Sequence, residues 1–176
     1  MYRNKYDNSD CAERGKSAEE RFKLLLETKG INGYRMTVTY STKIENINNH
    51  IDMWFESSKI PNKRFSADVK ARKRLNRSDA NLQDDLIWIE LKNVQGKNGW
   101  LYGDADYIVF EIESGFLICP KDKLIAQIEK LKPKFFESND NSKVPYKLYS
   151  RKNRKDLLVL IPIEEILPIS FKLTSR

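Results

Sequence analysis

The sequence predicts one domain of the α/β (α+β) class, built around a mixed β-sheet and spanning residues 1–176. Two observations lead to this fold class. The chain is long enough to bury a core, and its 40% hydrophobic residues are enough to form one. Segments with helical periodicity occur near the start and in the last third of the chain, and strand-like apolar runs lie between and after them.

Helical periodicity is found in two segments. The first helix is expected over residues 17–30, where Ser17 and Glu20 can form a capping box at its start. The second helix is expected over residues 121–131. Residues 1–12 are polar and show no such pattern, so we expect them to form a flexible N-terminal arm.

Strands are expected where β-branched and aromatic residues alternate with polar ones. Four such runs follow the first helix: residues 34–40, 50–56, 65–73 and 85–93. A hairpin is expected over residues 105–120, with its turn at Ser114 and Gly115. A second hairpin is expected over residues 146–163, around a basic turn, and a short element follows it.

Basic residues outnumber acidic ones, 32 to 25, which gives a formal net charge of +7. This balance favours a polyanionic partner such as DNA. The candidates for contacting DNA lie near the ends of apolar runs: Arg72, Lys73, Arg74, Lys92, Arg151, Lys152 and Arg154. No apolar run in the sequence is long enough to span a membrane, so no membrane partner is expected.

Acids and lysines recur at alternate positions of two predicted strands. Asp68 and Lys70 share a strand face, since side chains two residues apart point the same way, and Glu90 and Lys92 repeat the pattern. Such triplets also arise by chance at this composition, so their surroundings decide what they mean. Asp52 adds an acid on the preceding strand. If the three strands are neighbours, these side chains form either a site or a solvated face with cross-strand charge pairs.

A helix acid favours the first alternative. Glu19 shares a helix face with Phe22 and Leu26, which must pack against the sheet, so it is expected at the edge of the packed surface. A carboxylate there is costly unless something compensates it. A cation bound between the helix and the sheet would compensate Glu19, Asp52 and Asp68 together. Oxygen ligands of this kind suit Mg²⁺ or Mn²⁺ better than zinc.

This arrangement of a helix acid, a strand Asp and Asp-x-Lys on the next strand resembles the PD-(D/E)XK nuclease superfamily. The stretch "GKSAEERFKLLLETKG" is similar to the first core helix of that superfamily, and "WIELKNVQGKNGWLYGDADYIVFE" resembles a segment of phage-encoded nuclease-like proteins. The resemblance covers roughly residues 15–111, with weaker support to about residue 165. Ile51 stands before Asp52 where the superfamily usually has proline.

The resemblance implies a restriction-endonuclease-like fold, with a mixed central β-sheet flanked by helices. It also implies a DNA endonuclease that depends on Mg²⁺ or Mn²⁺. The implied catalytic residues are Asp52, Asp68, Lys70 and Glu19. The implied metal ligands are Asp52, Asp68, Glu19 and Glu90.

Several choices stay open. Glu90 and Lys92 are the competing signature pair, although Asp68 and Lys70 follow Asp52 at hairpin-scale spacing and precede a basic run. A non-catalytic DNA-binding protein on the same scaffold is the alternative function. A homodimer is also left open. The polar N-terminus, which lacks a secretory pattern, predicts a cytoplasmic location, and the resemblance implies a bacterial or phage-infected cell.

Overall fold

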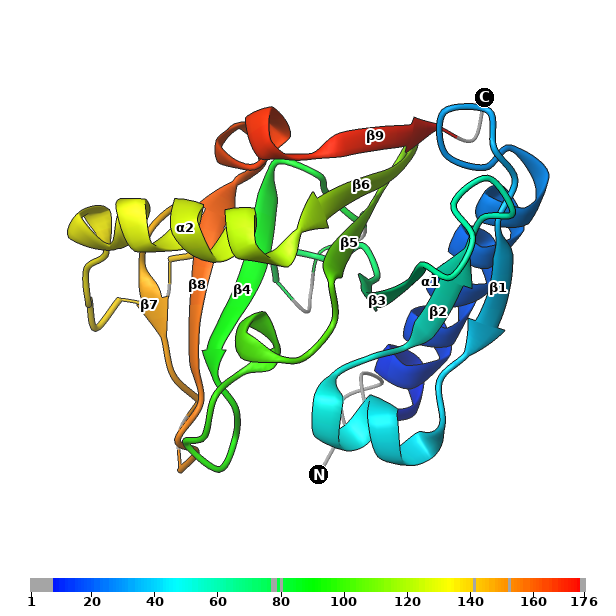
Figure 1. The fold of residues 1–176 in the computed structure, drawn as a ribbon. Helices are drawn as coiled ribbons and strands as arrows, with labels where there is room; N and C mark the ends of the chain where they lie inside the picture. Colours follow the sequence, from blue (N-terminus) through cyan, green and yellow to red (C-terminus); the bar gives the residue numbers. More distant parts are fainter. Residues whose placement is uncertain (1–7, 77–78, 80, 141, 152, 175–176) are drawn as a thin grey trace.

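A computed structural model describes residues 8–174 of the chain, except residues 77–78, 80, 141 and 152. The fold is of the mixed α and β class that the sequence predicts. The described residues form two helices, α1 and α2, and two β-sheets (Figure 1). Short helical turns connect them: η1 (Glu45–Asn49), η2 (Trp100–Tyr102), η3 (Lys132–Lys134), η4 (Ile163–Glu165) and η5 (Leu167–Ile169).

Helix α1 (Asn8–Thr28) begins nine residues earlier than the sequence predicts. Residues 8–12 are therefore helical rather than part of a flexible arm, while residues 1–7 lie outside the described part of the chain. Ser17 and Glu20 lie inside the helix, so the predicted capping box does not form there. The reason is that no proline or glycine cluster precedes them, and a single glycine costs a helix only about 1 kcal/mol.

The C-terminal end of α1 is formed as expected. Gly30 adopts the left-handed conformation with φ of 70°, and its N–H donates to the carbonyl of Leu25. A side chain at Gly30 would collide with the backbone of Tyr34. The turn therefore requires glycine and directs the chain back towards the sheet.

The central sheet has six strands, in the order β1-β2-β3-β5-β6-β9. Their bounds are β1 Thr37–Tyr40, β2 Met53–Glu56, β3 Arg64–Lys70, β5 Tyr107–Ile112, β6 Gly115–Pro120 and β9 Phe171–Thr174. Strands β3 and β5 are parallel, and the other neighbours are antiparallel. The predicted mixed central sheet is thus confirmed. The predicted hairpin forms from β5 and β6, with Ile112 opposite Gly115, so its turn lies one residue earlier than expected.

A second sheet contains the fourth predicted strand, β4 (Leu86–Lys92), with β8 (Leu157–Pro162) and β7 (Leu148–Tyr149). The condition that β4 lies beside β3 is therefore not met, because β5 takes that place. The sequences of β4 and β5, two apolar runs of similar length, do not distinguish these places, but the burial of the two strands in the fold does. Strand β5 has consecutive buried residues, as a strand covered on both faces requires, whereas β4 alternates and retains a partly exposed face.

Two hydrophobic clusters pack against the central sheet. On one face, Ala18, Phe22 and Leu26 of α1 lie against Met53 and Ala67. On the other face, the second sheet and α2 (Lys121–Leu131) enclose a larger cluster that includes the following residues: Ile89, Ile108, Leu124, Ile128 and Val159. Helix α2 occupies the segment that the sequence predicts. One face of the central sheet is thus covered by a helix, and the other by a helix together with a sheet.

Helix α1 packs against β1 and β3, whereas α2 packs against β6 and shares a hydrophobic cluster with the second sheet (Figure 1). None of the helices that the structure describes is both long and apolar enough to cross a membrane. The start of β2 lies beside the end of β3 because the two strands are antiparallel. Asp52 and Asp68 therefore lie close together, where β2 begins and β3 ends.

Candidate active site

Asp52 and Asp68 lie next to each other on adjacent strands. The backbone N–H of Asp52 donates to the carbonyl of Ala67 at 2.9 Å, which extends the pairing of β2 with β3 by one residue. The Asp52 carboxylate accepts a 2.6 Å hydrogen bond at Oδ2 from the N–H of Val69. The strand acid is therefore fixed directly to the strand that carries Asp68 and Lys70.

Asn46 holds the other oxygen of Asp52. Its Nδ2 atom donates to Asp52 Oδ1 at 2.6 Å. Asn46 belongs to η1, where the Glu45 carboxylate accepts hydrogen bonds from Thr42 and His50 closes the turn in the left-handed conformation. The sequence does not reveal this role, because the only signal is a polar residue in the loop before the strand acid.

Asp68 is almost completely buried, with 2% of its surface exposed. Its Oδ1 atom accepts a 2.5 Å hydrogen bond from the Lys70 ammonium group, two residues along the same strand. Its Oδ2 atom is buried, and among the described residues the neighbouring Asp52 carboxyl group, when protonated, is the side chain that can donate to Asp68 in addition to Lys70. Asp68 therefore does not belong to a solvated sheet face, and its buried Oδ2 atom is available to a ligand.

Lys70 lies between the acidic pair and an aromatic ring. Its Nζ atom is 4.8 Å from the centroid of the Trp100 ring, a cation–π distance. Trp100 begins η2 and is buried, so it anchors this loop on the core. The backbone N–H of Trp100 donates to Glu90 Oε2 at 3.3 Å. Glu90, Asp52 and Lys70 all act electrostatically on His50, whose pKa is lowered mainly by burial, so Glu90 lies near the same site.

Burial and mutual repulsion raise the pKa values of two carboxyl groups. Burial, and secondly the Asp68 carboxyl group, raise the pKa of Asp52 to about 6. Burial, and secondly Asp52, raise the pKa of Glu19 to about 7. The Lys70 ammonium group opposes both shifts but does not cancel them. The site thus has more negative charge than its single lysine neutralises.

Glu19 lies on α1 as predicted, partly buried and on the same helix face as buried Phe22 and Leu26. Its electrostatic interaction with Asp52 connects it to the site. However, within the described part of the chain, no group of three or more Asp, Glu, His and Cys side chains is arranged to hold a metal ion. The structure therefore joins Asp52, Asp68 and Lys70 closely, and Glu19 through charge alone.

The chemistry of these donors fits a hard divalent cation. Asp68 offers a buried oxygen that faces the Asp52 carboxyl group, and burial together with Asp68 disfavours the negative charge of Asp52. Divalent cations such as Mg²⁺ prefer oxygen ligands, and a cation would relieve the repulsion between these acids. Asp52 and Asp68 are thus the residues that would hold a cation.

Glu90 and Lys92 lie on a strand of the second sheet, whereas Asp68 lies on a strand of the central sheet. Strand β4 pairs with β8, where Leu158 lies opposite Glu90 and Leu157 lies opposite Lys92. No strand acid corresponding to Asp52 lies beside Glu90 among these paired residues. The condition under which Glu90 would share a sheet face with Asp68, that the three strands are neighbours, is therefore not met.

The predicted DNA contacts around β3 are unequal in exposure. Arg72 is paired through Nε with Asp84 at 2.6 Å, with 19% of its side chain exposed. Lys73 is exposed, and Arg74 is partly buried. Among these three side chains, Lys73 is the one that faces solvent most fully.

The remaining predicted contacts lie at one end of the second sheet. Lys92 and Arg154 are exposed, and Arg151 forms an ion pair with buried Asp156. Lys152 lies outside the described residues. The end of β4 and the basic turn are neighbours, because the backbone N–H of Lys155 donates to the carbonyl beyond that strand end.

Comparisons of the chain with known protein families, with curated proteins and with solved structures found no match.

Proposed function

We propose that this protein is a divalent-metal-dependent DNA endonuclease that hydrolyses phosphodiester bonds. The observation that carries this proposal is the contact of Lys70 with buried Asp68 beside Asp52 on the next strand. A carboxyl group with a raised pKa, here Asp52, beside a second buried carboxylate is more typical of functional sites than of ordinary surfaces. Its resemblance to the PD-(D/E)XK arrangement supports the same reaction and a restriction-endonuclease-like fold.

Each residue has a distinct part in the proposed reaction. A bound Mg²⁺ or Mn²⁺ ion would polarise the phosphodiester and supply a more acidic water. Asp52 and Asp68 provide the carboxylates, and Asn46 with the Val69 N–H keeps Asp52 in position. Lys70 places a positive charge where negative charge develops on the phosphate in the transition state.

The charge of the protein supports DNA as the substrate. A net charge of +7 attracts a polyanion, and exposed lysine and arginine side chains can contact its phosphates. We assign this role first to Lys73, Lys92 and Arg154, which are exposed. Arg72 and Arg151 already form ion pairs within the protein, so their contribution is smaller.

The test is incubation of the purified protein with supercoiled, linear and branched DNA in the presence of Mg²⁺, Mn²⁺ or EDTA. We expect cutting or nicking with either metal and none with EDTA. Asp68→Asn is expected to abolish cutting while retaining DNA binding, because it removes a buried negative charge and not the basic surface. Cutting that persists in EDTA would contradict the proposal.

One observation favours the alternative of a non-catalytic DNA-binding protein. The described acids do not form a three-residue group arranged to hold a metal ion. The buried acids argue against this alternative, since they repel phosphate and would be lost from a pure binding surface without cost. Tight, salt-dependent DNA binding without cutting in any metal would establish it.

Metal binding is expected to depend on pH. Asp52, with a pKa of about 6, and Glu19, with a pKa of about 7, hold protons in mildly acidic solution, and a cation must displace them. We expect Mg²⁺ affinity to be at least about tenfold weaker at pH ~5 than at pH ~8, from Asp52 alone. The measurement is the shift in melting temperature with Mg²⁺ at each pH. Equal shifts at both pH values would contradict this prediction.

A further inference from the structure

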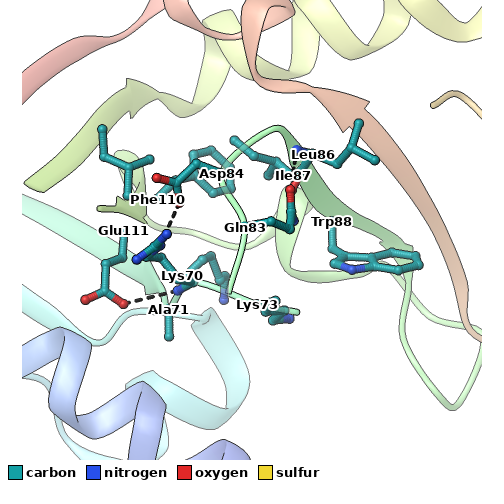
Figure 2. A pocket seen from close by; sticks show the side chains of 12 residues that line it. Lys70, Ala71, Lys73, Gln83, Asp84, Leu86, Ile87, Trp88, Phe110 and Glu111 are labelled. Atoms are coloured by element: carbon teal, nitrogen blue, oxygen red, sulfur yellow. Dashed lines mark hydrogen bonds and ion pairs between the residues drawn. The ribbon is translucent and has the colours of Figure 1, made fainter. Parts of the chain in front are cut away.

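A pocket is lined on one side by Lys70, the lysine of the proposed active site (Figure 2). It lies between the ends of β3 and β5 on one side and β4 on the other. Its lining includes Lys70 and Lys73 together with Leu86, Ile87 and Trp88 of β4. Because Lys70 contacts Asp68, the pocket is continuous with the proposed active site.

Trp88 gives this pocket a partly exposed aromatic ring. In Figure 2, Trp88 lies at one side of the pocket and Glu111 at the opposite side. The ring is supported by residues outside the pocket lining. Tyr149 packs edge-on against Trp88 with ring centroids 5.0 Å apart, and the Lys143 ammonium group lies 5.5 Å from the Trp88 centroid. The indole is therefore a supported surface on which a planar group can stack.

The acids that line the pocket are already compensated. Asp84 pairs with Arg72 at 2.6 Å. Glu111 accepts hydrogen bonds from the Arg21 guanidinium group, at 2.8 Å to Nε, and from the backbone N–H of Arg72. The pocket lining also includes exposed Lys73 and the partly exposed ring of Trp88. A base with its phosphate matches both features.

The pocket is open to solvent, and the space inside it, the solvent at its mouth included, is about 420 Å³. A duplex is too wide to lie between β3 and β4. The base of an unpaired nucleotide next to a duplex can lie at the pocket mouth while its neighbouring phosphate remains beside Lys70.

We propose that this pocket binds one unpaired nucleotide of the substrate strand, with its base stacked on Trp88 and its phosphate near Lys70 and Lys73. The protein thereby selects DNA in which a single strand joins a duplex. This inference rests on the proposed function, because Lys70 belongs to both the pocket and the proposed active site.

The test compares a blunt duplex with the same duplex carrying a single-stranded tail, in EDTA so that no DNA is cut. The first unpaired base of the tail is 2-aminopurine, whose fluorescence is quenched by stacking. Stacking of one base contributes about 1–3 kcal/mol, so we expect the tail to strengthen binding by about 5- to 150-fold. We also expect quenching when the protein binds.

Variants of Trp88 test whether the stronger binding of tailed DNA depends on its indole ring. Trp88→Ala should lower the affinity for tailed DNA to that for blunt DNA and abolish quenching, whereas Trp88→Phe should retain most of both. The matched control is Tyr34→Ala, because Tyr34 is also an exposed aromatic residue under a lysine, 5.9 Å from Lys59 Nζ, and does not line the pocket. It should leave both affinities unchanged.

The possible failures can be told apart. Equal affinity of the wild-type protein for the two DNAs, or equal weakening of both by Trp88→Ala, would overturn the pocket assignment even if the DNA is cut when Mg²⁺ is added. A Trp88-dependent preference for tailed DNA without cutting in any metal would sustain the pocket and overturn the nuclease. No binding to either DNA would overturn both.

Discussion

Replacing Lys70 with alanine is expected to lower the rate of DNA cutting by about 100- to 1,000-fold, the usual loss when one group that stabilises transition-state charge is removed. The variant loses the ammonium group that donates a hydrogen bond to Asp68, and it loses the cation–π contact with Trp100. DNA binding should change by no more than about threefold, because Lys70 is one of many positive charges and is largely covered. Single-turnover cutting and equilibrium binding measure the two quantities separately.

The matched control for Lys70→Ala is Lys92→Ala. Lys92 is the lysine of the competing signature pair, and it is exposed at the end of β4. We expect this variant to weaken DNA binding slightly and to leave the rate of cutting in the bound complex unchanged. A loss of cutting confined to Lys92→Ala and Glu90→Gln would show that the wrong strand has been assigned to catalysis.

Replacing Asp52 with asparagine is expected to abolish metal-dependent cutting and, in the absence of metal, to stabilise the protein above pH ~6. Folding raises the pKa of Asp52 from 3.8 to about 6, so the folded state binds the proton more tightly than the unfolded chain does. The free energy of unfolding therefore falls as the pH rises from about 4 to about 6, by at most about 3 kcal/mol from this group. Asparagine has no charge, so the variant does not lose this free energy of unfolding as the pH rises.

The hydrogen bonds of Asp52 can survive this substitution. The asparagine oxygen can accept from the Val69 N–H, and the Asn46 amide can turn to accept from the new Nδ2. Chemical unfolding at pH ~5 and pH ~8 measures the effect. Asp85→Asn is the control, because Asp85 is exposed and should change stability at neither pH. An Asp52→Asn variant less stable than the wild type at pH ~8 would refute the account of the buried charge.

Local sequence patterns predict much of this fold. Helix α2 occupies the predicted residues 121–131 because its apolar positions and polar flanks are both local signals. The β5–β6 hairpin is found within one residue of its predicted turn for the same reason. The closeness of Asp52 and Asp68 also follows from local information, since a short connection between two strands makes them antiparallel neighbours.

Other features depend on contacts between distant parts of the chain. Nothing local places β5 rather than β4 beside β3, because both are apolar runs of similar length. The hydrogen bond of Asn46 with Asp52 needs the turn η1, which has no strong sequence signature. The pocket at Trp88 requires the second sheet to face the end of β3. The sequence therefore indicates the acidic pair but not the surroundings that would select its substrate.

The pairing of β4 with β8 has a consequence for protein synthesis. The N-terminal part of the chain emerges from the ribosome first, so most of the central sheet can assemble once β6 has emerged. Strand β4 cannot pair until residues 157–162 have also been made. Until then β4 is an unpaired apolar edge, the kind of surface along which chains associate. A prematurely terminated product would carry Asp52, Asp68 and Lys70 without the paired strand that holds Trp88, and so would lack the residue that we propose selects the substrate.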